Sequence, residues 1–536
     1  MPPPDRSSRA AWASLLAVLA LACLLRAPAA AIPLERDEGG YAYIAWRWLH
    51  GELPYLTSFD QKPPGIYAAY AAILAGVGRS PAALHWGAEL WTLGTLALVF
   101  VLGRRLGGTA VGACAAAFCA LLTSEPTLLG NAANTEIFML LPLVGALLAA
   151  LLARQRDSLA AAALPGALSG LALLFKQTAL WNALFAGALV VGVSDPAGRA
   201  ARRALAFAGA GLAATLAPAA GFVAAGAFAP FWDCVIGHNL AYAESVPLAL
   251  YPSAFWTTFA RTLRPLGALY ALGALGASAG LASADTPERR AARIVLGFTL
   301  ASAAGVATGG YFRQHYYLQA APGLALLAAL GLARRLPEQT GRRVPMGLLA
   351  CGGVLALALS AAPWYWLPGS PEAKARRLYP GNPFPESARV ATWLSEHTRP
   401  DDTVFVFGSE PEIYFLAQRR AASRYIYVYP LMTTFSDTPE RQRSVLAELA
   451  AGPPAAVVTV TSPVSFLRQP ATSPELFLGL RERLLRDYRP VARVPVQAPE
   501  RLEPISEDEG ARMLALHPGL GEPETWGSLA VWERRR

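Results

Sequence analysis

Charged side chains and cysteines are scarce in this 536-residue chain. Only 15% of its residues are charged, whereas an ordinary soluble domain carries about 25%. This scarcity excludes a disordered chain and a nucleic-acid-binding protein. Its five cysteines lie in or beside apolar segments, and no CxxC pair occurs. The sequence therefore predicts neither a disulfide framework nor a zinc site.

The charges that are present are distributed unevenly. Residues 366–536 carry 21 basic and 21 acidic side chains, which is the density of a soluble domain. Residues 1–365 carry 25 basic and 16 acidic side chains, so the net charge of +9 belongs to this apolar part. We expect a polytopic α-helical membrane domain over 1–365, followed by a soluble α/β domain over 366–536.

Eleven segments are apolar enough to be membrane spans, which need about 20 such residues. They are residues 10–32, 83–103, 109–128, 135–153, 159–176, 178–193, 204–226, 265–283, 292–309, 315–333 and 344–362. Sixteen arginines fall in alternate loops between them, which predicts a cytoplasmic N-terminus and an outer C-terminal domain. Ala29–Ala31 resembles a signal-peptide cleavage site, but we expect the first span to be retained.

The pattern of residues 366–536 alternates between helix and strand, as in a small layered α/β domain. Helices are expected over 386–398, 410–420, 438–451 and 475–488, and strands over 403–408, 425–430, 455–460, 492–496 and 529–533.

The first outer loop, residues 33–80, is too long and too aromatic for a simple connection. Its amphipathic runs 40–50 and 65–78 are too short to span a membrane and are expected to be helices in the interface. Ionisable side chains gather in this loop and at the outer ends of other spans, where such groups are costly and usually functional. They are Arg36, Asp37, Glu38, Asp60, Lys62, Glu136, Lys176, His238, Arg313 and His315.

If the spans pack together, these groups surround one cavity at the outer face. A carboxylate there can take a proton from a hydroxyl, and cations can stabilise a phosphate leaving group. Lysine is rare in the chain, with three against 43 arginines, and two of the three, Lys62 and Lys176, belong to this set. An ammonium at these positions suits a phosphate.

Each of these residues also has a structural interpretation. Asp37 and Glu38 could be a solvated pair, Glu136 could cap a helix, and His238 could be an ordinary loop residue. His85 and Glu89 lie four residues apart on one span and could pair inside the bundle. The tyrosine and tryptophan residues of 41–48 could form an interface belt rather than a sugar-stacking surface.

Residues 36–67, RDEGGYAYIAWRWLHGELPYLTSFDQKPPGIY, resemble the first outer loop of glycosyltransferase family 39-like membrane enzymes. These include protein O-mannosyltransferases, lipid A aminoarabinose transferases and rhizobial lipopolysaccharide galacturonosyltransferases. The shared features are an acidic pair followed by Tyr-Ala, then Gly-x-x-Pro-Tyr and Asp-x-Lys-Pro-Pro. Short motifs at 134–136, 175–177 and 315–317 also fit, so the resemblance covers nearly all of 1–365.

The resemblance implies a GT-C fold and a polyprenyl-phosphate-linked sugar donor. The composition, rich in arginine and poor in lysine, together with a retained first span favours a bacterial inner membrane, with the reaction at its outer face. The reaction would invert the sugar, and the acceptor would be a hydroxyl of a lipid, a polysaccharide or a protein. Asp37 corresponds to the catalytic carboxylate and Glu38 to a supporting acid. Lys62 corresponds to a ligand of the donor phosphate, with Arg313, His315 and Lys176 as candidate partners, and Tyr41, Asp60, Glu136 and His238 as candidate substrate contacts.

No organic cofactor is expected, although Asp37, Glu38 and Glu136 offer oxygen ligands to a divalent cation. A polytopic transporter of an envelope precursor is the main alternative, because many spans and buried charges also suit one. Transporters usually carry internal repeats and place these charges near the bilayer midplane. A non-catalytic assembly subunit is a third interpretation.

Overall fold

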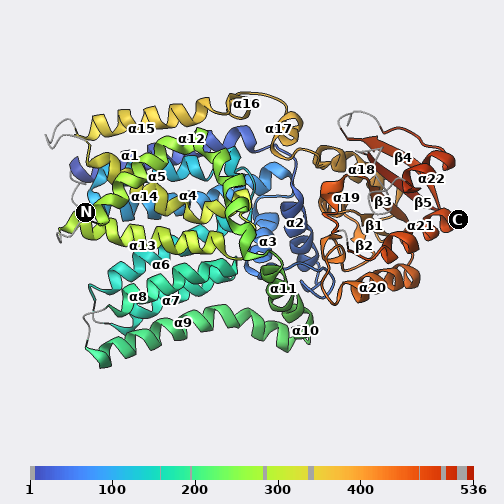
Figure 1. Cartoon of the computed structure of the whole chain (residues 1–536), viewed down its shortest axis with the longest axis horizontal. Helices are drawn as coiled ribbons and strands as arrows, with labels where there is room; N and C mark the ends of the chain where they lie inside the picture. Colours follow the sequence, from blue (N-terminus) through green and yellow to red (C-terminus); the bar gives the residue numbers. More distant parts are fainter. Residues whose placement is uncertain are drawn as a thin grey trace.

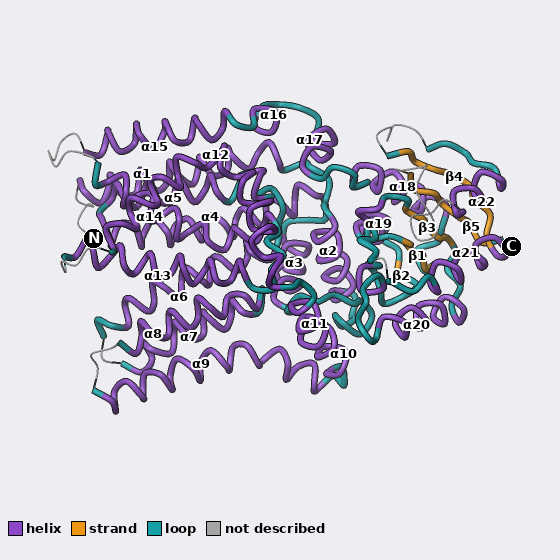
Figure 2. Tube along the Cα trace, viewed as in Figure 1, coloured by secondary structure: helices purple, strands orange, loops and turns teal. Residues whose placement is uncertain are grey.

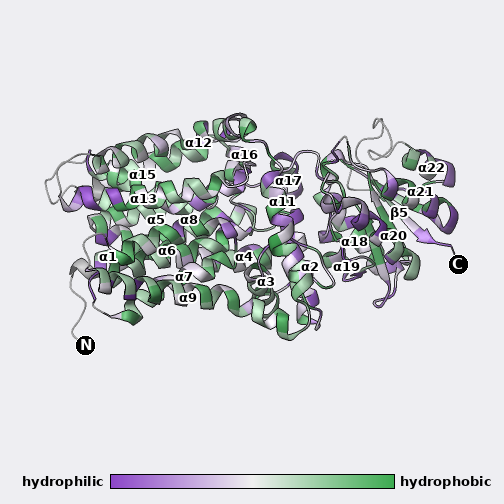
Figure 3. Cartoon of the chain, turned by 60° about the horizontal axis from the view of Figure 1, so that its bottom comes forward, coloured by the Kyte–Doolittle hydropathy of each residue, from purple (hydrophilic) through white to green (hydrophobic). Residues whose placement is uncertain are grey.

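The computed structural model describes residues 6–156, 158–192, 196–281, 286–335, 343–469, 471–496, 502–515 and 528–535. A bundle of roughly parallel and antiparallel helices occupies one end of the molecule, and a smaller domain with a β-sheet occupies the other (Figure 1). Hydrophobic colouring runs along the bundle helices, while hydrophilic residues are denser in the smaller domain (Figure 3). The bundle and the smaller domain therefore differ in both fold and surface chemistry.

Every predicted span coincides with a helix of the bundle. The helices are α1 (Arg6–Arg26), α4 (Pro81–Gly107), α5 (Thr109–Leu122), α6 (Thr135–Ala153), α7 (Leu159–Leu173), α8 (Leu180–Val191), α9 (Ala197–Ala224), α12 (Tyr251–Gly280), α13 (Pro287–Ala307), α14 (Ala321–Ala333) and α15 (Arg343–Ser360). Within the described residues, six segments are long and apolar enough to cross a membrane. The chain is a multi-pass membrane protein.

The two helices predicted within the first outer loop are present as α2 (Arg36–Leu49) and α3 (Gly65–Gly76). In Figure 1, α2 lies at the end of the bundle that faces the small domain and runs across the bundle helices. It begins four residues earlier than the pattern predicts, because a capping box forms at its start. The Glu35 side chain accepts from the Glu38 N–H, and the Glu38 side chain accepts from the Glu35 N–H. Asp37 therefore lies on a helix rather than in a loop.

The small domain contains a five-stranded sheet with the order β2-β1-β3-β5-β4. Its strands are β1 (Thr403–Phe407), β2 (Arg420–Ala421), β3 (Ala456–Val460), β4 (Tyr488–Pro495) and β5 (Ser528–Arg534). Its helices are α18 (Phe384–His397), α19 (Glu412–Ala417), α20 (Thr438–Ala451), α21 (Glu475–Asp487) and α22 (Glu507–Ala515). Two short helices, α16 (Pro363–Trp366) and α17 (Pro371–Leu378), lead from the bundle to this domain (Figure 1). Strand β1 is parallel to β2 and β3, whereas β5 is antiparallel to β3 and β4.

One predicted strand is wrong, and one predicted helix is too long. Residues 425–430 form bends that lead into a 3-10 turn instead of a strand. Their alternation arises because Tyr425 stacks on Phe59 of the outer loop, while Ile426 and Val428 face the core. The helix predicted over 410–420 is limited to α19, since Gln418 adopts a left-handed conformation with φ of 53° and leads into the edge strand β2.

Candidate active site

A cavity of about 580 Å³ lies between the outer loops of the membrane domain and the small domain. Figure 2 shows loop segments crowded between the bundle and the sheet domain at this level. Six residues of the predicted site line the cavity: Asp37, Asp60, Lys62, His238, Arg313 and His315. Four others, Glu38, Tyr41, Glu136 and Lys176, are not among the residues that line it.

Asp37 occupies the first turn of α2 and is half-buried at the cavity wall. Within the described part of the chain, no hydrogen bond or ion pair engages its carboxylate. The N-terminus of a helix favours a negative charge through its partial positive charge. Asp37 therefore presents a carboxylate with free lone pairs to whatever enters the cavity.

Lys62 lies at the opposite end of the same loop, just before Pro63 and Pro64. Its backbone carbonyl accepts hydrogen bonds from the hydroxyls of Tyr55 and Tyr67, which fixes the start of its side chain. Burial opposes the charge on its ammonium, but the carboxylates of Asp37 and Asp60 outweigh this effect and raise the pKa of Lys62. The lysine therefore stays cationic.

Arg313 supplies a second cation to the cavity, and its guanidinium lies 5.5 Å from the centre of the Tyr311 ring. Neither Lys62 nor Arg313 forms an ion pair with any acidic side chain in the regions that the structure describes. His315 follows Arg313 by two residues and also lines the cavity. The arrangement offers two positive charges to an anion, close to a carboxylate that can act as a base.

Asp60 and His238 are both more than nine-tenths buried in the cavity wall. Burial raises the pKa of Asp60 to about 6, with Asp37 adding to the rise and Lys62 opposing it. Burial and the nearby Arg441 guanidinium lower the pKa of His238 to about 4, so its imidazole is neutral. The ring of His238 packs edge-on against Phe59 and Phe435.

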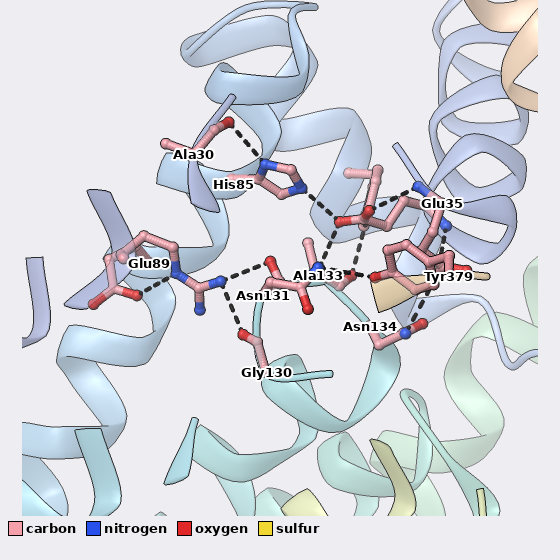
Figure 4. Close-up of polar contacts among 12 residues, drawn as sticks. Ala30, Glu35, His85, Glu89, Gly130, Asn131, Ala133, Asn134 and Tyr379 are labelled. Atoms are coloured by element: carbon pink, nitrogen blue, oxygen red, sulfur yellow. Dashed lines mark hydrogen bonds and ion pairs between the residues drawn. The ribbon is translucent and has the colours of Figure 1, made fainter. Parts of the chain in front are cut away.

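Glu38 is buried and joins a network whose partners Glu35, His85 and Ala133 are labelled in Figure 4. Its carboxylate accepts from the ring Nε2 of His85 at 2.9 Å, from the Ala133 N–H at 2.6 Å and from the Glu35 N–H at 3.1 Å. The other ring nitrogen of His85 contacts the Ala30 carbonyl at 2.9 Å. In this position Glu38 holds the start of α2 against the bundle.

Glu136 and Lys176 form an ion pair with each other behind the cavity wall. The ammonium of Lys176 also lies 3.4 Å from the centre of the Tyr316 ring. Glu136 is in the first turn of α6, but the hydrogen bonds of its side chain go to Lys176 and Thr135 rather than to the helix start. Tyr41 is fully buried between Tyr67 and Tyr70.

The proposed pairing of His85 with Glu89 is wrong. Glu89 instead pairs with Arg26 at 3.0 Å, and Arg26 also donates to the carbonyls of Gly130 and Asn131 (Figure 4). Arg26 is 1% exposed. A charged side chain inside an apolar span costs free energy unless it has a partner. The single arginine of the span predicted over 10–32 could therefore have indicated a buried ion pair from the sequence alone.

The small domain binds directly to the start of α2. The guanidinium of Arg36 donates to the Glu410 carboxylate at 3.2 Å and to the Asn382 side-chain oxygen at 3.0 Å. A Cβ atom added to Gly39 would lie 2.6 Å from the Glu412 backbone nitrogen, and one added to Gly40 would lie 1.5 Å from the Tyr427 hydroxyl oxygen. These glycines allow a contact too close for any larger residue.

No group of three or more His, Cys, Asp or Glu side chains suited to a metal ion occurs among the described residues. Asp37, Glu38 and Glu136 do not gather, because Glu38 and Glu136 face other partners. These three carboxylates therefore do not form the divalent-cation site that the sequence left open. No step of the chemistry is assigned to a metal ion.

Residues 61–222 match the model of the dolichyl-phosphate-mannose-protein mannosyltransferase family. No curated protein matches the chain in sequence. Among solved structures, ArnT from Cupriavidus metallidurans in the apo state superposes with a TM-score of 0.58 at 16% identity, covering 98% of each chain. The same enzyme bound to undecaprenyl phosphate gives 0.57 at 18% identity, covering 96% of this chain and 97% of ArnT.

The apo oligosaccharyltransferase of Archaeoglobus fulgidus also superposes, with a TM-score of 0.55 at 13% identity over 92% of this chain and 74% of that one. These proteins are GT-C glycosyltransferases. The GT-C-like fold with a C-terminal α/β domain, and the likeness to this group of membrane enzymes, are confirmed.

Proposed function

We propose that the protein transfers a sugar from a polyprenyl-phosphate donor to an acceptor hydroxyl at the outer face of the bacterial inner membrane. One observation carries this proposal. The carboxylate of Asp37, which has no partner of its own among the described residues, lines the same cavity as Lys62 and Arg313. The fold shared with ArnT, which has been solved with undecaprenyl phosphate, supports a lipid-phosphate donor. A transporter would place its charges near the midplane, whereas this cavity lies at one end of the bundle.

The chemistry follows from the charges in the cavity. The lipid chain of the donor stays in the bilayer, while its phosphate binds to Lys62 and Arg313. Asp37 takes the proton of the acceptor hydroxyl, and the oxygen attacks the anomeric carbon of the sugar. A new glycosidic bond forms as the bond from that carbon to the phosphate oxygen breaks. The electron pair leaves with the phosphate, which the two cations stabilise, and the anomeric centre is inverted.

The donor can be identified by incubating the purified protein with radiolabelled polyprenyl-phosphate sugars. Release of polyprenyl phosphate, by transfer or by hydrolysis, is the expected result for at least one sugar. A protein that binds these lipids without ever breaking the sugar–phosphate bond would contradict the proposal and favour a transporter or a non-catalytic subunit.

The proposed orientation, with the small domain on the outer side of the membrane, can be tested separately. A membrane-impermeant thiol reagent added from outside should label a cysteine at Gly369 and should not label one at Gly198. Both positions are exposed at opposite ends of the membrane domain, and Gly198 lies beside arginines that favour the cytoplasm. Replacing Cys23 with serine removes the native cysteine that is not buried. Gly341, in another loop predicted to be cytoplasmic, lies outside the described residues and is not used for this test. Labelling in the reverse pattern would overturn the orientation.

Replacing Lys62 with alanine should weaken donor binding by about 10-fold or more, because a charge-assisted hydrogen bond contributes about 1.5–3 kcal/mol. Turnover should fall as well, since the leaving phosphate loses a cation. Lys62→Arg should restore only part of the loss, because guanidinium and ammonium differ in shape and hydration. Titrating the variants with polyprenyl phosphate measures the effect.

Arg79→Ala is the matched control, because Arg79 is an exposed cation at the end of the same loop and is not among the residues that line the cavity. Unchanged donor affinity in Lys62→Ala would remove Lys62 from the phosphate site.

A further inference from the structure

The two walls of the cavity differ in charge. The charged residues come from the membrane domain, within residues 35–62 and 238–315. Every described residue that the small domain contributes to the lining is uncharged. These residues include Tyr379, Asn382, Tyr427, Thr433, Phe435 and Gln469. One wall is therefore suited to a phosphate, and the facing wall to a neutral ligand.

Among the described residues, no arginine or lysine of the small domain lines the cavity. Arg424 and Arg441 of this domain contact Asp233 of the membrane domain and are not in the cavity lining. Arg36 lies between the walls, but its guanidinium is bound to Glu410 and Asn382. A second phosphate group, carried by an acceptor, would therefore find no cation among the described lining residues of this wall to replace its hydration.

The cavity lining also holds buried polar atoms that have no hydrogen-bond partner within the described residues. One of them, the Tyr427 hydroxyl, belongs to the small domain. The other four belong to the facing wall of the membrane domain: Asp60 Oδ2, Gln61 Oε1, Asn134 Oδ1 and His238 Nδ1. Buried polar atoms are normally satisfied, so such a set indicates a ligand that satisfies them. Three of the five are oxygens that can only accept hydrogen bonds. They match the O–H donors of a sugar that lies between the two walls.

Tyr427, on the neutral wall of the small domain, lies close to the proposed base Asp37. Its hydroxyl lies against Gly40, where no side chain intervenes. Asp37 is three residues before Gly40 on α2, so the two positions are on neighbouring parts of one helix face. A hydroxyl group bound at Tyr427 therefore lies within reach of the Asp37 carboxylate.

We infer that the acceptor is a neutral carbohydrate whose sugar ring lies against the aromatic wall of the small domain. The apolar face of a sugar packs on rings such as Phe435 and Tyr427, and its hydroxyls bond to the unpaired oxygens. The edge strand β2 is not part of the described cavity lining, and its Ala421 N–H donates to the Tyr43 hydroxyl of α2, so the cavity offers a peptide no sheet edge to pair with. This inference rests on the proposed function and specifies its acceptor.

The test uses the purified full-length protein, its polyprenyl-phosphate sugar donor and three tagged acceptors. These are neutral hexose trisaccharides, the same trisaccharides with a phosphate monoester, and a peptide rich in serine and threonine. Transfer to the neutral trisaccharides is expected, with at least 10-fold lower kcat/KM for the phosphorylated forms. Preference for the phosphorylated form or for the peptide would overturn the inference.

Two variants show which substrate the neutral wall holds. Tyr427→Phe and Phe435→Ala should each raise the KM for the neutral acceptor by about 10-fold, while the KM for the donor changes less than 2-fold. Tyr488→Phe is the matched control, because the Tyr488 hydroxyl bonds to the Pro454 carbonyl outside the cavity. An equal melting temperature in all three confirms that they fold.

A rise in the KM for the donor alone would assign these polar atoms to the donor sugar and overturn the inference. Hydrolysis of the donor in the absence of acceptor is measured in parallel. If only the KM for the donor rises but the donor is still hydrolysed, the acceptor assignment is overturned and the proposed function stands. Absence of both hydrolysis and transfer would instead overturn the proposed function, and the acceptor assignment with it.

Discussion

Replacing Asp37 with asparagine should lower turnover by about 10² or more, which is the usual contribution of a general base. The amide keeps the shape of the side chain but cannot accept the proton of the acceptor hydroxyl. Donor affinity should change little, because in the proposed function Lys62 and Arg313, and not Asp37, bind the phosphate. The loss should therefore appear in kcat and not in the binding constant for polyprenyl phosphate.

Transfer of labelled sugar by the purified variant in detergent measures this effect. Asp401→Asn is the matched control, since Asp401 is exposed in a turn of the small domain. Full activity of Asp37→Asn would rule out the assignment. Asp60, the other carboxylate of the cavity lining that has an unpaired oxygen, would then be the residue to test.

The second large effect concerns stability. Arg26→Met should lower the free energy of unfolding by about 3–5 kcal/mol, which is the usual cost of breaking a buried ion pair by removing one partner. The variant leaves the Glu89 carboxylate buried without its cation. It also removes the donor of the Gly130 and Asn131 carbonyls, which precede the Ala133 N–H that holds Glu38. Activity should fall together with stability.

Thermal unfolding of the purified protein in detergent measures the loss. The double variant Arg26→Met/Glu89→Leu should recover part of it, because no uncompensated charge remains. Arg9→Met, which removes an exposed arginine of the same helix, should change the melting temperature little. If the melting temperature of Arg26→Met is no lower than that of Arg9→Met, the Arg26–Glu89 ion pair is not needed for stability.

Much of the fold could be predicted because its patterns are local. The apolar segments coincide with the bundle helices, and the short amphipathic runs coincide with α2 and α3. The predicted strand over 425–430 failed because the alternation of Tyr425 and Tyr427 reflects contacts with Phe59 and Gly40, which lie more than 350 residues earlier. Alternation alone cannot distinguish such contacts from a sheet.

The candidate site was predictable where its residues are charged. Asp37, Lys62 and Arg313 stand out because ionisable groups are costly at the end of an apolar span. The wall formed by the small domain was missed because it consists of uncharged side chains such as Tyr427 and Phe435, which resemble core residues in the sequence. The role of Glu38 was missed because its partner His85 is 47 residues away.

The order of strands in the small domain affects how the protein matures in the cell. Strand β5, the last element described, lies between β3 and β4 in the interior of the sheet. A ribosome releases the first outer loop early and this strand late, so the sheet can close only after β5 has emerged. A chain shortened before Ser528 leaves β3 and β4 without the strand that pairs with both. Such a chain would expose two unpaired strand edges, which can pair with other chains and cause aggregation.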